Sequence, residues 1–194
     1  GLGIESGSQR ILDSMNKRST VEKNISAIEA VKEAGLNTVA QCIYGYPGEN
    51  SETVNETIDF FRRADALHQG FFVLTPLPGT TLYNQCIEKG VIVNEDEYLS
   101  NLDAGYNTSR DALVNLTDFS IDEFYETKDF MEDRIMRNYF FRHPFKQIVV
   151  RDDHNNLKHA FLGGEVFRTA LKRISKRGLI KKNSRITSYS GKSI

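Results

Sequence analysis

The sequence is poor in cysteine and proline and has no tryptophan: its 194 residues include two cysteines and four prolines. Cys42 and Cys86 form no CxxC pair and are too few for a disulfide framework. Disulfide-rich scaffolds are therefore excluded, and a reducing, cytoplasmic location is expected. The first residues also lack the basic and then apolar stretch of a secretory signal peptide.

Long apolar runs are absent as well. The longest uncharged run, residues 69–87, approaches the ~20 residues that a membrane-spanning helix needs. It contains two prolines and two glycines, a composition typical of a strand and a turn, so we expect no membrane span. With 39% hydrophobic and 26% charged residues, fibrous and fully disordered chains are excluded, and the length is sufficient for a hydrophobic core.

Charge is unevenly distributed, although the net charge is only −1. Residues 166–194 contain nine lysines and arginines and no acidic residue, so residues 1–165 carry −10. Such a segment can attract nucleic acid or anionic lipid, but it also suits a helix end followed by a frayed tail. We favour the second interpretation, because few aromatic side chains there could stack on bases, and nucleic acid is not an expected partner.

Strand-like apolar runs alternate with amphipathic helical patterns through the first 90 residues or so. The predicted strands are residues 1–5, 37–44 and 70–75, and the predicted helices are residues 9–15, 20–34, 51–66 and 80–88. Helix starts are predicted from Ser8, Ser19–Glu22 with capping-box spacing, and Ser51, and helix ends from Gly35 and Gly90. The predicted fold class is α/β with parallel strands, either a (βα) barrel or an open doubly wound sheet. Three strands are too few to close a barrel.

The alternation stops after about residue 93. The remaining predictions are a short helix over 95–102, an irregular stretch over 103–119, a long helix from a capping box at Ser120–Glu123 to about Arg142, an apolar run at 145–150, a polar turn at 152–156 and a last helix over 157–177. We therefore divide the chain into an α/β part (1–93), a mainly helical extension (94–178) and a basic, disordered tail (179–194).

Polar side chains stand where each predicted strand ends. Glu5 and Ser6 follow the first strand, Gln41 lies near the end of the second, and Thr75 ends the third. In parallel α/β folds, ligands bind at the carboxyl ends of the strands. Glycine-containing turns, ESGS (5–8) and GYPGE (45–49), follow the first two strands and can let backbone amides approach a ligand.

Side chains alternate along a strand, which assigns the two faces of the sheet. If Leu2, Ile4, Ala40 and Leu74 face the helices, then Glu5, Gln41 and Thr75 converge on the other face, and Cys42 faces the helices. These polar groups either bond to loop amides or form a surface that binds a small ligand, and we favour the surface. A buried Glu5 needs a partner, for which Lys17 is a candidate. No cluster with metal-ligand spacing is present, so no metal site is expected.

Three consecutive segments resemble one family of enzymes. They are GIESGSQRIL (3–12) with MNK (15–17), AGL (34–36) leading into YGYPGE (44–49), and FVLTPLPGT (72–80) with LY (82–83). In order and spacing they are similar to the fourth, fifth and sixth strand regions of radical S-adenosylmethionine (radical SAM) enzymes. The branch resembles the cobalamin-binding-domain type, which includes the anaerobic magnesium-protoporphyrin ester cyclases. The resemblance covers about residues 1–90, and the rest is similar to the helical extension that often follows the barrel.

The resemblance implies a fold and a set of cofactors. The fold is the carboxyl-terminal half of a partial (βα)6 TIM-like barrel, followed by a helical extension. The cofactors are S-adenosylmethionine, a [4Fe-4S] cluster and, in some members, cobalamin. In such enzymes, reductive cleavage of the sulfonium gives a 5′-deoxyadenosyl radical that abstracts a substrate hydrogen, or methyl transfer proceeds through cobalamin. The substrate, a small or lipid-like molecule, is not specified by the resemblance.

The resemblance also implies cofactor-binding residues. By position, Glu5, with Ser6 beside it, matches a polar site near the ribose and the methionine part of S-adenosylmethionine. Lys17 matches a basic residue that can reach the ligand carboxylate. Gln41 matches a ribose-side position that is often acidic, and Thr75 matches a backbone contact to adenine. No catalytic or metal-binding residue is implied.

One departure from the family pattern concerns the cluster. The motif CxxxCxxC is absent, and Cys42 and Cys86 cannot supply three thiolates. The chain also begins, at Gly1, inside a strand-like run without a methionine. We interpret it as the carboxyl-terminal part of a longer radical SAM enzyme, inactive alone, whose missing amino-terminal half is its partner and holds the cluster ligands. Two alternatives stay open: a non-catalytic α/β binding module without the cluster, and a domain that binds anions or nucleic acid through its basic tail.

Overall fold

The computed structural model describes residues 1–36, 38–102, 114–143, 147–151, 157–161 and 187–188. They fall into two compact units, one of residues 1–135 with 185–194 and one of residues 136–184, and each is described by itself. Several segments with sequence predictions lie outside the described residues. They are most of the irregular stretch over 103–119, the polar turn at 152–156, residues 162–177 and nearly all of the basic segment 166–194. Within the described ranges, no helix has the length and apolar composition to cross a membrane.

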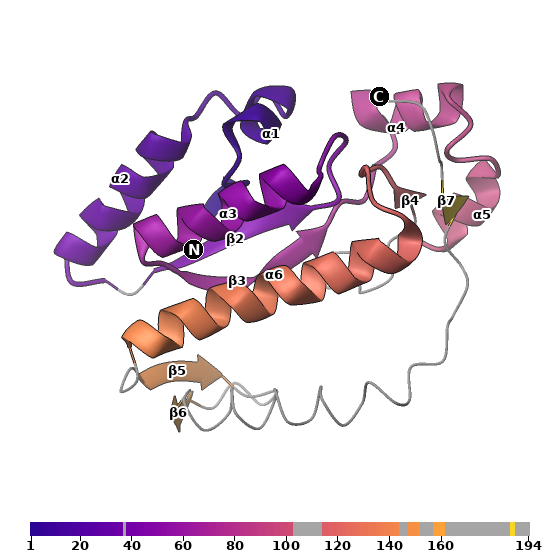
Figure 1. The fold of residues 1–194 in the computed structure, drawn as a ribbon. Helices are drawn as coiled ribbons and strands as arrows, with labels where there is room; N and C mark the ends of the chain where they lie inside the picture. The colour runs from indigo at the N-terminus through magenta and orange to yellow at the C-terminus, as the bar shows by residue number, and fades with distance from the viewer. Residues whose placement is uncertain (37, 103–113, 144–146, 152–156, 162–186, 189–194) are drawn as a thin grey trace. The chain divides into compact units, whose positions relative to one another are not determined.

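A parallel sheet of three strands forms the centre of the first unit (Figure 1). The strands are β1 (Leu2–Glu5), β2 (Val39–Tyr44) and β3 (Leu67–Val73), in the spatial order β1-β2-β3. They alternate with the helices α1 (Gln9–Ser14), α2 (Val21–Glu33), α3 (Ser51–Ala64) and α4 (Thr81–Glu88). The predicted α/β class with a parallel sheet is confirmed. β3 begins at Leu67 and ends at Val73, whereas the prediction was residues 70–75.

One face of this sheet carries the main hydrophobic core. On β2 every second residue is buried, namely Ala40, Cys42 and Tyr44. The other core residues of the strands and of α2 and α3 are Ile4, Ile25, Ile28, Val54, Phe60, Phe61, Ala64, Phe71 and Val73. The burial of Cys42 among them confirms that it faces the helices. Gln41 and Ile43 alternate with the buried residues and are only half-buried, so the opposite face of the sheet is the more open one.

Glycine ends two of the helices as predicted. Gly35 follows α2 with φ 74°, and Gly90 follows α4 with φ 66°. In both cases the two amides after the helix donate back to carbonyls of the last turn, which is the Schellman arrangement. The left-handed backbone that this arrangement requires is open to glycine without steric cost.

Two helices begin one residue away from the predicted cap. The side chain of Thr20, rather than Ser19, accepts the Lys23 amide at the start of α2. Asn50, rather than Ser51, caps α3 and forms a reciprocal capping box with Thr53. Serine, threonine and asparagine cap helices with similar strength, so adjacent candidates are not separated by the sequence pattern.

A second, smaller hydrophobic cluster lies after the sheet. It contains residues of α4, α5 (Glu95–Ser100) and β4 (Val114–Asn115). The helix α5 confirms the predicted short helix. The strand β4 pairs in parallel with β7 (Thr187–Ser188). The Tyr98 hydroxyl donates to the Pro76 carbonyl at 2.6 Å, and the Tyr83 hydroxyl donates to the Glu95 carboxylate at 2.6 Å. The first bond fixes the loop that follows β3.

The long helix α6 (Ile121–Arg142) begins at the predicted capping box. The Ser120 amide donates to the Glu123 carboxylate at 2.8 Å, and the Glu123 amide donates to the Ser120 hydroxyl at 3.4 Å. The backbone and side-chain bonds from Ser120 lower the pKa of Glu123. The part of α6 inside the first unit adds Phe124, Met131 and Ile135 to the main core.

α6 also contacts the edge strand of the sheet. Lys128 and Glu132 form an ion pair at 2.6 Å in which the side chains are only 11% and 13% exposed. The same Glu132 oxygen accepts the Phe71 amide of β3 at 3.4 Å. A helix that pairs with backbone groups of an edge strand protects that edge from pairing with other chains.

The second unit contains paired strands where a helix was predicted. β5 (Gln147–Arg151) and β6 (Leu157–Phe161) are antiparallel, with Gln147 opposite Phe161. The predicted helix over 157–177 is therefore wrong at residues 157–161, and its remainder lies outside the described residues. Apolar residues four apart fit one face of a strand as well as one face of a helix. Pairing with β5, which is rich in β-branched residues, selects the strand. The domain boundaries proposed from the sequence stay predictions.

Candidate functional site

The chain leaves β1 through a strained three-residue turn centred on Glu5. The register of β1 against β2 shifts between Gly3 and Glu5, as in a β-bulge. Glu5 has φ 68°, and the Ser6 amide donates to the Ile4 carbonyl at 3.0 Å. A γ-turn with positive φ is rare and costs a residue other than glycine on the order of 1–3 kcal/mol. Strain of this kind is concentrated at functional sites, which makes Glu5 a candidate.

Lys17 contacts the Glu5 carboxylate directly. Its Nζ lies 2.7 Å from Glu5 Oε1, and the side chains of Lys17 and Glu5 are 34% and 23% exposed. The predicted partner of Glu5 is therefore confirmed. Because solvent reaches both charged groups, a ligand can also reach them.

The end of α1 fixes the position of Lys17. The Asn16 amide donates to the Asp13 carbonyl and the Lys17 amide to the Leu12 carbonyl, which is a Schellman arrangement with asparagine at the left-handed position. Asn16 has φ 52° and Arg18 has φ 54°, so Lys17 stands between two left-handed residues. The backbone that leads into Lys17 is thus held by local hydrogen bonds.

Glycines leave room for this ion pair on the open face of the sheet. A Cβ added to Gly3 would lie 3.0 Å from Glu5 Oε1 and 3.9 Å from Lys17 Nζ. Gln41 is the partner of Gly3 in the sheet, and a Cβ added to Gly1 would lie 3.5 Å from Gln41 Nε2. The Glu5 carboxylate, the Lys17 ammonium group and the Gln41 amide therefore lie on one face, as predicted for Glu5 and Gln41.

Ser6 is occupied inside the turn. It is 1% exposed, and its hydroxyl accepts the Ser8 amide at 3.1 Å. Ser8 stands at the predicted helix start, but its side chain makes no capping bond, and its buried hydroxyl has no hydrogen-bond partner. A contact of Ser6 with a cofactor stays a prediction.

The face predicted for the third strand is wrong. Alternation along the predicted strand puts Phe71 and Val73 on the same face as Thr75, but both are buried in the main core. Leu74, predicted to face the helices, packs on the second cluster, which includes residues of α4 and α5. Thr75 lies in the loop after β3, where its hydroxyl donates to the Val73 carbonyl at 3.4 Å. Because β3 ends at Val73, strand alternation does not bring Thr75 to Glu5 and Gln41.

A buried carboxylate that the sequence analysis did not single out anchors the turn after β2. Glu49 is 5% exposed, and its Oε2 accepts the Gly45 amide at 2.7 Å. Burial raises the pKa of Glu49 to about 7, although backbone bonds from Gly45 and Tyr46 act in the opposite direction. The sequence holds one signal for this role, a carboxylate four residues after a glycine in a turn, but it does not show that the carboxylate is buried.

The turn after β2 is tied to α1. Arg10 donates to the Gly48 carbonyl at 2.8 Å, and the Tyr46 hydroxyl donates to the Ser14 carbonyl at 3.0 Å. Since Lys17 follows α1 by three residues, this helix is linked both to the Glu5–Lys17 ion pair and to the turn after β2.

Both cysteines are poor metal ligands in this structure. Burial raises the pKa of Cys42 well above its usual range, and the carboxylates of Glu5 and Glu49 add to this effect. Burial also raises the pKa of Cys86 to about 11. Burial thus disfavours the thiolate of both residues, which is the form that binds metals. Among the residues that the structure describes, no group of three or more His, Cys, Asp or Glu could hold a metal ion.

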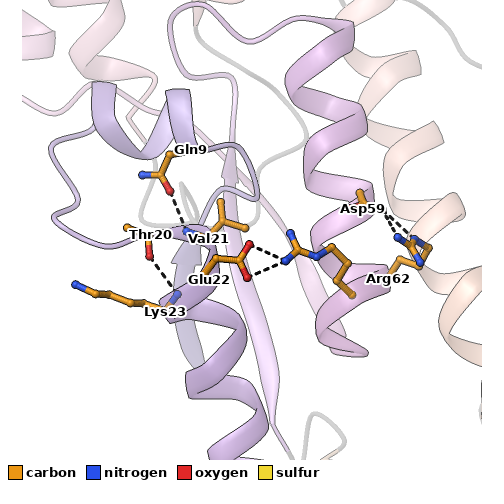
Figure 2. Close-up of polar contacts among 8 residues, drawn as sticks. Gln9, Thr20, Val21, Glu22, Lys23, Asp59 and Arg62 are labelled. Atoms are coloured by element: carbon orange, nitrogen blue, oxygen red, sulfur yellow. Dashed lines mark hydrogen bonds and ion pairs between the residues drawn. The ribbon is translucent and has the colours of Figure 1, made fainter.

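An open cleft lies on the helix side of the first unit. It is lined by Gly7, Gln9, Val21, Glu22, Glu52, Asn55, Glu56, Asp59 and Arg63. Figure 2 shows polar contacts beside it, including Gln9 with the Val21 amide and Arg62 with Asp59. Arg63 also donates to both carboxylate oxygens of Glu22, at 2.6 and 2.8 Å. None of the predicted binding residues lines this cleft.

Comparison with known proteins agrees with the resemblance noted in the sequence. Residues 1–61 match the family model of the radical SAM superfamily. The chain is 36% identical over 92 residues to an uncharacterised methyltransferase from Pyrococcus horikoshii, covering 47% of this chain and 20% of that protein. It is 33% identical over 97 residues to the anaerobic magnesium-protoporphyrin IX monomethyl ester cyclase of Rubrivivax gelatinosus, covering 50% and 18%. It is 32% identical over 95 residues to the tRNA-2-methylthio-N(6)-dimethylallyladenosine synthase of Paracoccus denitrificans, covering 48% and 21%.

These matches span about a fifth of the length of each relative. The chain is related to radical SAM enzymes of the branch that contains the magnesium-protoporphyrin ester cyclases, and the resemblance stated from the sequence is confirmed.

Proposed function

We propose that this relative of the radical SAM enzymes supplies part of an S-adenosylmethionine site. The observation that carries the proposal is the Glu5–Lys17 ion pair, which stands at the carboxyl end of β1 on the open face of the sheet. Ligands of parallel α/β folds bind at this end of the strands. The left-handed Glu5 and the two left-handed residues beside Lys17 are further support, because strained backbone is retained where function requires it.

The two charged groups fit the amino-acid part of S-adenosylmethionine. That part carries an ammonium group and a carboxylate, which are complementary to Glu5 and Lys17 respectively. In this proposal Glu5 accepts a hydrogen bond from the ligand ammonium group or a ribose hydroxyl, and Lys17 donates to the ligand carboxylate. When the ligand binds, its charged groups replace the Glu5–Lys17 contact. When the ligand leaves, Glu5 and Lys17 pair again, so neither charge is unpaired. Gln41 is proposed on the ribose side, and the backbone near Thr75 on the adenine side.

The proposed reaction class is radical-based modification of a substrate: methylation, cyclisation or rearrangement. In radical SAM enzymes, S-adenosylmethionine bound at a reduced [4Fe-4S] cluster supplies the radical chemistry. The residues of this chain contribute binding and orientation of the ligand. The printed names of the relatives include a methyltransferase, a cyclase and a methylthio-adenosine synthase, which supports the class but does not select one reaction.

The residues of this chain do not fit the cluster itself. A [4Fe-4S] cluster needs several nearby thiolates, and the sequence has two cysteines, both buried. We therefore propose that the cluster ligands, the remaining strands of a partial (βα)6 barrel and any cobalamin site lie outside these 194 residues. A non-catalytic binding module is the second candidate, and the lack of cluster ligands favours it. A CxxxCxxC motif encoded upstream of these residues would decide for the enzyme, and its absence for the module.

Titration calorimetry with S-adenosylmethionine tests the binding site, on the longer protein that the proposal requires and with its cluster reconstituted anaerobically. Glu5→Ala removes a charged hydrogen bond worth roughly 1.5–3 kcal/mol, so affinity should fall about 10–150-fold. Glu22→Ala is the matched control, because it also removes an ion-paired carboxylate but lies in the cleft on the helix side. Its affinity should equal that of the wild type. Absence of binding by the wild type, or equal losses in both variants, would contradict the proposal.

A further inference from the structure

The turn at Glu5 is supported from the helix layer as well as by Lys17. Ile4 is 2% exposed, and its carbonyl accepts the Ser6 amide within the turn at 3.0 Å. The register shift of β1 occurs at the same place. A residue other than glycine keeps φ 68° only where the surrounding groups hold it there. The Ile4 carbonyl is therefore the point at which the turn can be held.

Asn24 of α2 contacts this carbonyl. Asn24 is 7% exposed, and its Nδ2 donates to the Ile4 carbonyl at 3.4 Å. The Ser19 hydroxyl donates to Asn24 Oδ1 at 2.8 Å, which orients the carboxamide with its amino group toward Ile4. The other buried residues of α2 are Ile25 and Ile28. A carboxamide buried in such a helix is retained where its hydrogen bonds are needed.

We propose that Asn24 is a positioning residue for Glu5. It fixes the Ile4 carbonyl on the helix side of the sheet, while Lys17 holds the Glu5 carboxylate on the open side. The two contacts together keep the strained turn in one conformation, with the carboxylate aimed at the amino-acid part of an S-adenosylmethionine ligand. The inference rests on the proposed function for the ligand and on the contacts of Asn24 for the mechanism.

A purely packing role for Asn24 makes a different prediction. In that case its replacement would lower global stability, as Ile28→Val is expected to do by removing a methylene from the same buried face of α2. A positioning role predicts a local change instead. Without the hydrogen bond from Asn24 to the Ile4 carbonyl, Glu5 should relax toward an extended φ. The Ser6 amide should then lose its hydrogen bond to the same carbonyl. The local conformation at Glu5 and Ser6 thus distinguishes the two roles.

The test compares Asn24→Leu, Ser19→Ala and the control Ile28→Val in the full 194-residue chain. Nuclear magnetic resonance on this chain measures the Ser6 amide exchange rate and the Glu5 coupling that reports φ. Calorimetry on the longer protein, with its cluster reconstituted, measures affinity for S-adenosylmethionine. In Asn24→Leu we expect about tenfold faster exchange and about tenfold weaker binding, the effect of one ordinary hydrogen bond. Ser19→Ala should shift both in the same direction by less, and Ile28→Val should leave both at wild-type values.

Each result decides one claim. If the Ser6 amide exchange rate and the Glu5 coupling are the same in Asn24→Leu as in the wild type, the positioning role is overturned, whatever the affinity for S-adenosylmethionine. A wild type that does not bind S-adenosylmethionine, together with altered signals in Asn24→Leu, defeats the proposed function but leaves the effect of Asn24 on Glu5 established. If Asn24→Leu does not fold, Ser19→Ala carries the same test, because it keeps the carboxamide but removes the hydroxyl that orients it.

Discussion

Replacing Gly7 with alanine is expected to destabilise the chain through lack of space. Gly7 is not one of the glycines with positive φ, so alanine can adopt its backbone conformation. A Cβ there would lie 2.6 Å from the Phe60 Cβ and 2.6 Å from the Thr57 Cα. Non-bonded carbon atoms in contact are about 3.5–4.0 Å apart. Neither neighbour can rotate away, so α3 or the turn after β1 must move by about 1 Å.

The cost combines three terms. Overpacking of this kind costs about 1–3 kcal/mol. The movement also disturbs the bond from the Gly7 amide to the Thr57 hydroxyl, 3.2 Å long, and a bond of this type contributes about 0.5–1.5 kcal/mol. Alanine restricts the unfolded chain, which offsets about 0.4–1 kcal/mol. The net expectation is a loss of about 2–3 kcal/mol in the free energy of unfolding.

Gly35→Ala is the matched control for this prediction. A Cβ there meets no atom within 4 Å, but the backbone has φ 74°, so its cost is conformational and about 1–2 kcal/mol. Urea unfolding followed by circular dichroism gives both values. Gly7→Ala should lose more stability than Gly35→Ala. If Gly7→Ala is as stable as the wild type, the close packing of the turn against α3 is refuted.

Three further predictions concern the chain as a whole. Anaerobic reconstitution with iron and sulfide should assemble no [4Fe-4S] cluster, because there are two buried cysteines, and about four irons per monomer would contradict this. The pKa of Glu49, raised to about 7 in the folded state, predicts that stability is greatest below the unfolded pKa near 4.5 and falls as pH rises to about 7. Urea unfolding between pH 4 and 8 should show this slope in the wild type and not in Glu49→Gln. β1 has one neighbour in the described sheet, so its free edge should cause oligomers in size-exclusion chromatography, and a stable monomer would show that the edge is covered.

The order of strands and helices in the α/β part could be predicted because its signals are local. The glycines at the left-handed positions after α2 and α4 end those helices through a local backbone conformation. The strand β2 could be predicted because VAQCIY is an almost continuous apolar run, although that run does not show which of its residues are buried. Even the cap shifts at Thr20 and Asn50 are single-residue choices between chemically similar neighbours.

Strand β3 and the pair β5–β6 show where local signals fail. His68 and Gln69 interrupt the apolar run that predicted a strand start at Gly70. In the structure His68 is buried within β3, with its ring 5.8 Å from Phe61 and 5.0 Å from Phe71. Those aromatic neighbours, one of them on α3, make burial of the histidine favourable, and sequence periodicity does not reveal them. β6 likewise depends on its pairing with β5.

The candidate site was predictable only in part for the same reason. Glu5, Lys17 and Gln41 could be grouped because strand ends and alternation follow from short sequence patterns. The left-handed φ of Glu5 and the contact of Asn24 with the Ile4 carbonyl arise from a bulge and from packing between layers. The role of Glu49 could not be predicted, because glutamate is usually exposed and the sequence does not show that this carboxylate is buried against backbone amides.

The Glu5–Lys17 pair should add little to stability, and a double-mutant cycle can show this. The side chains are 23% and 34% exposed, and ion pairs that solvent reaches typically contribute about 0.2–1 kcal/mol. Urea unfolding of Glu5→Gln, Lys17→Met and the double variant should therefore give a coupling energy below about 1 kcal/mol. The same cycle on S-adenosylmethionine affinity should show losses of about tenfold or more for each single variant. A coupling above about 2 kcal/mol in unfolding, with unchanged affinity, would mean that the pair is a structural element and that the strained turn serves the fold.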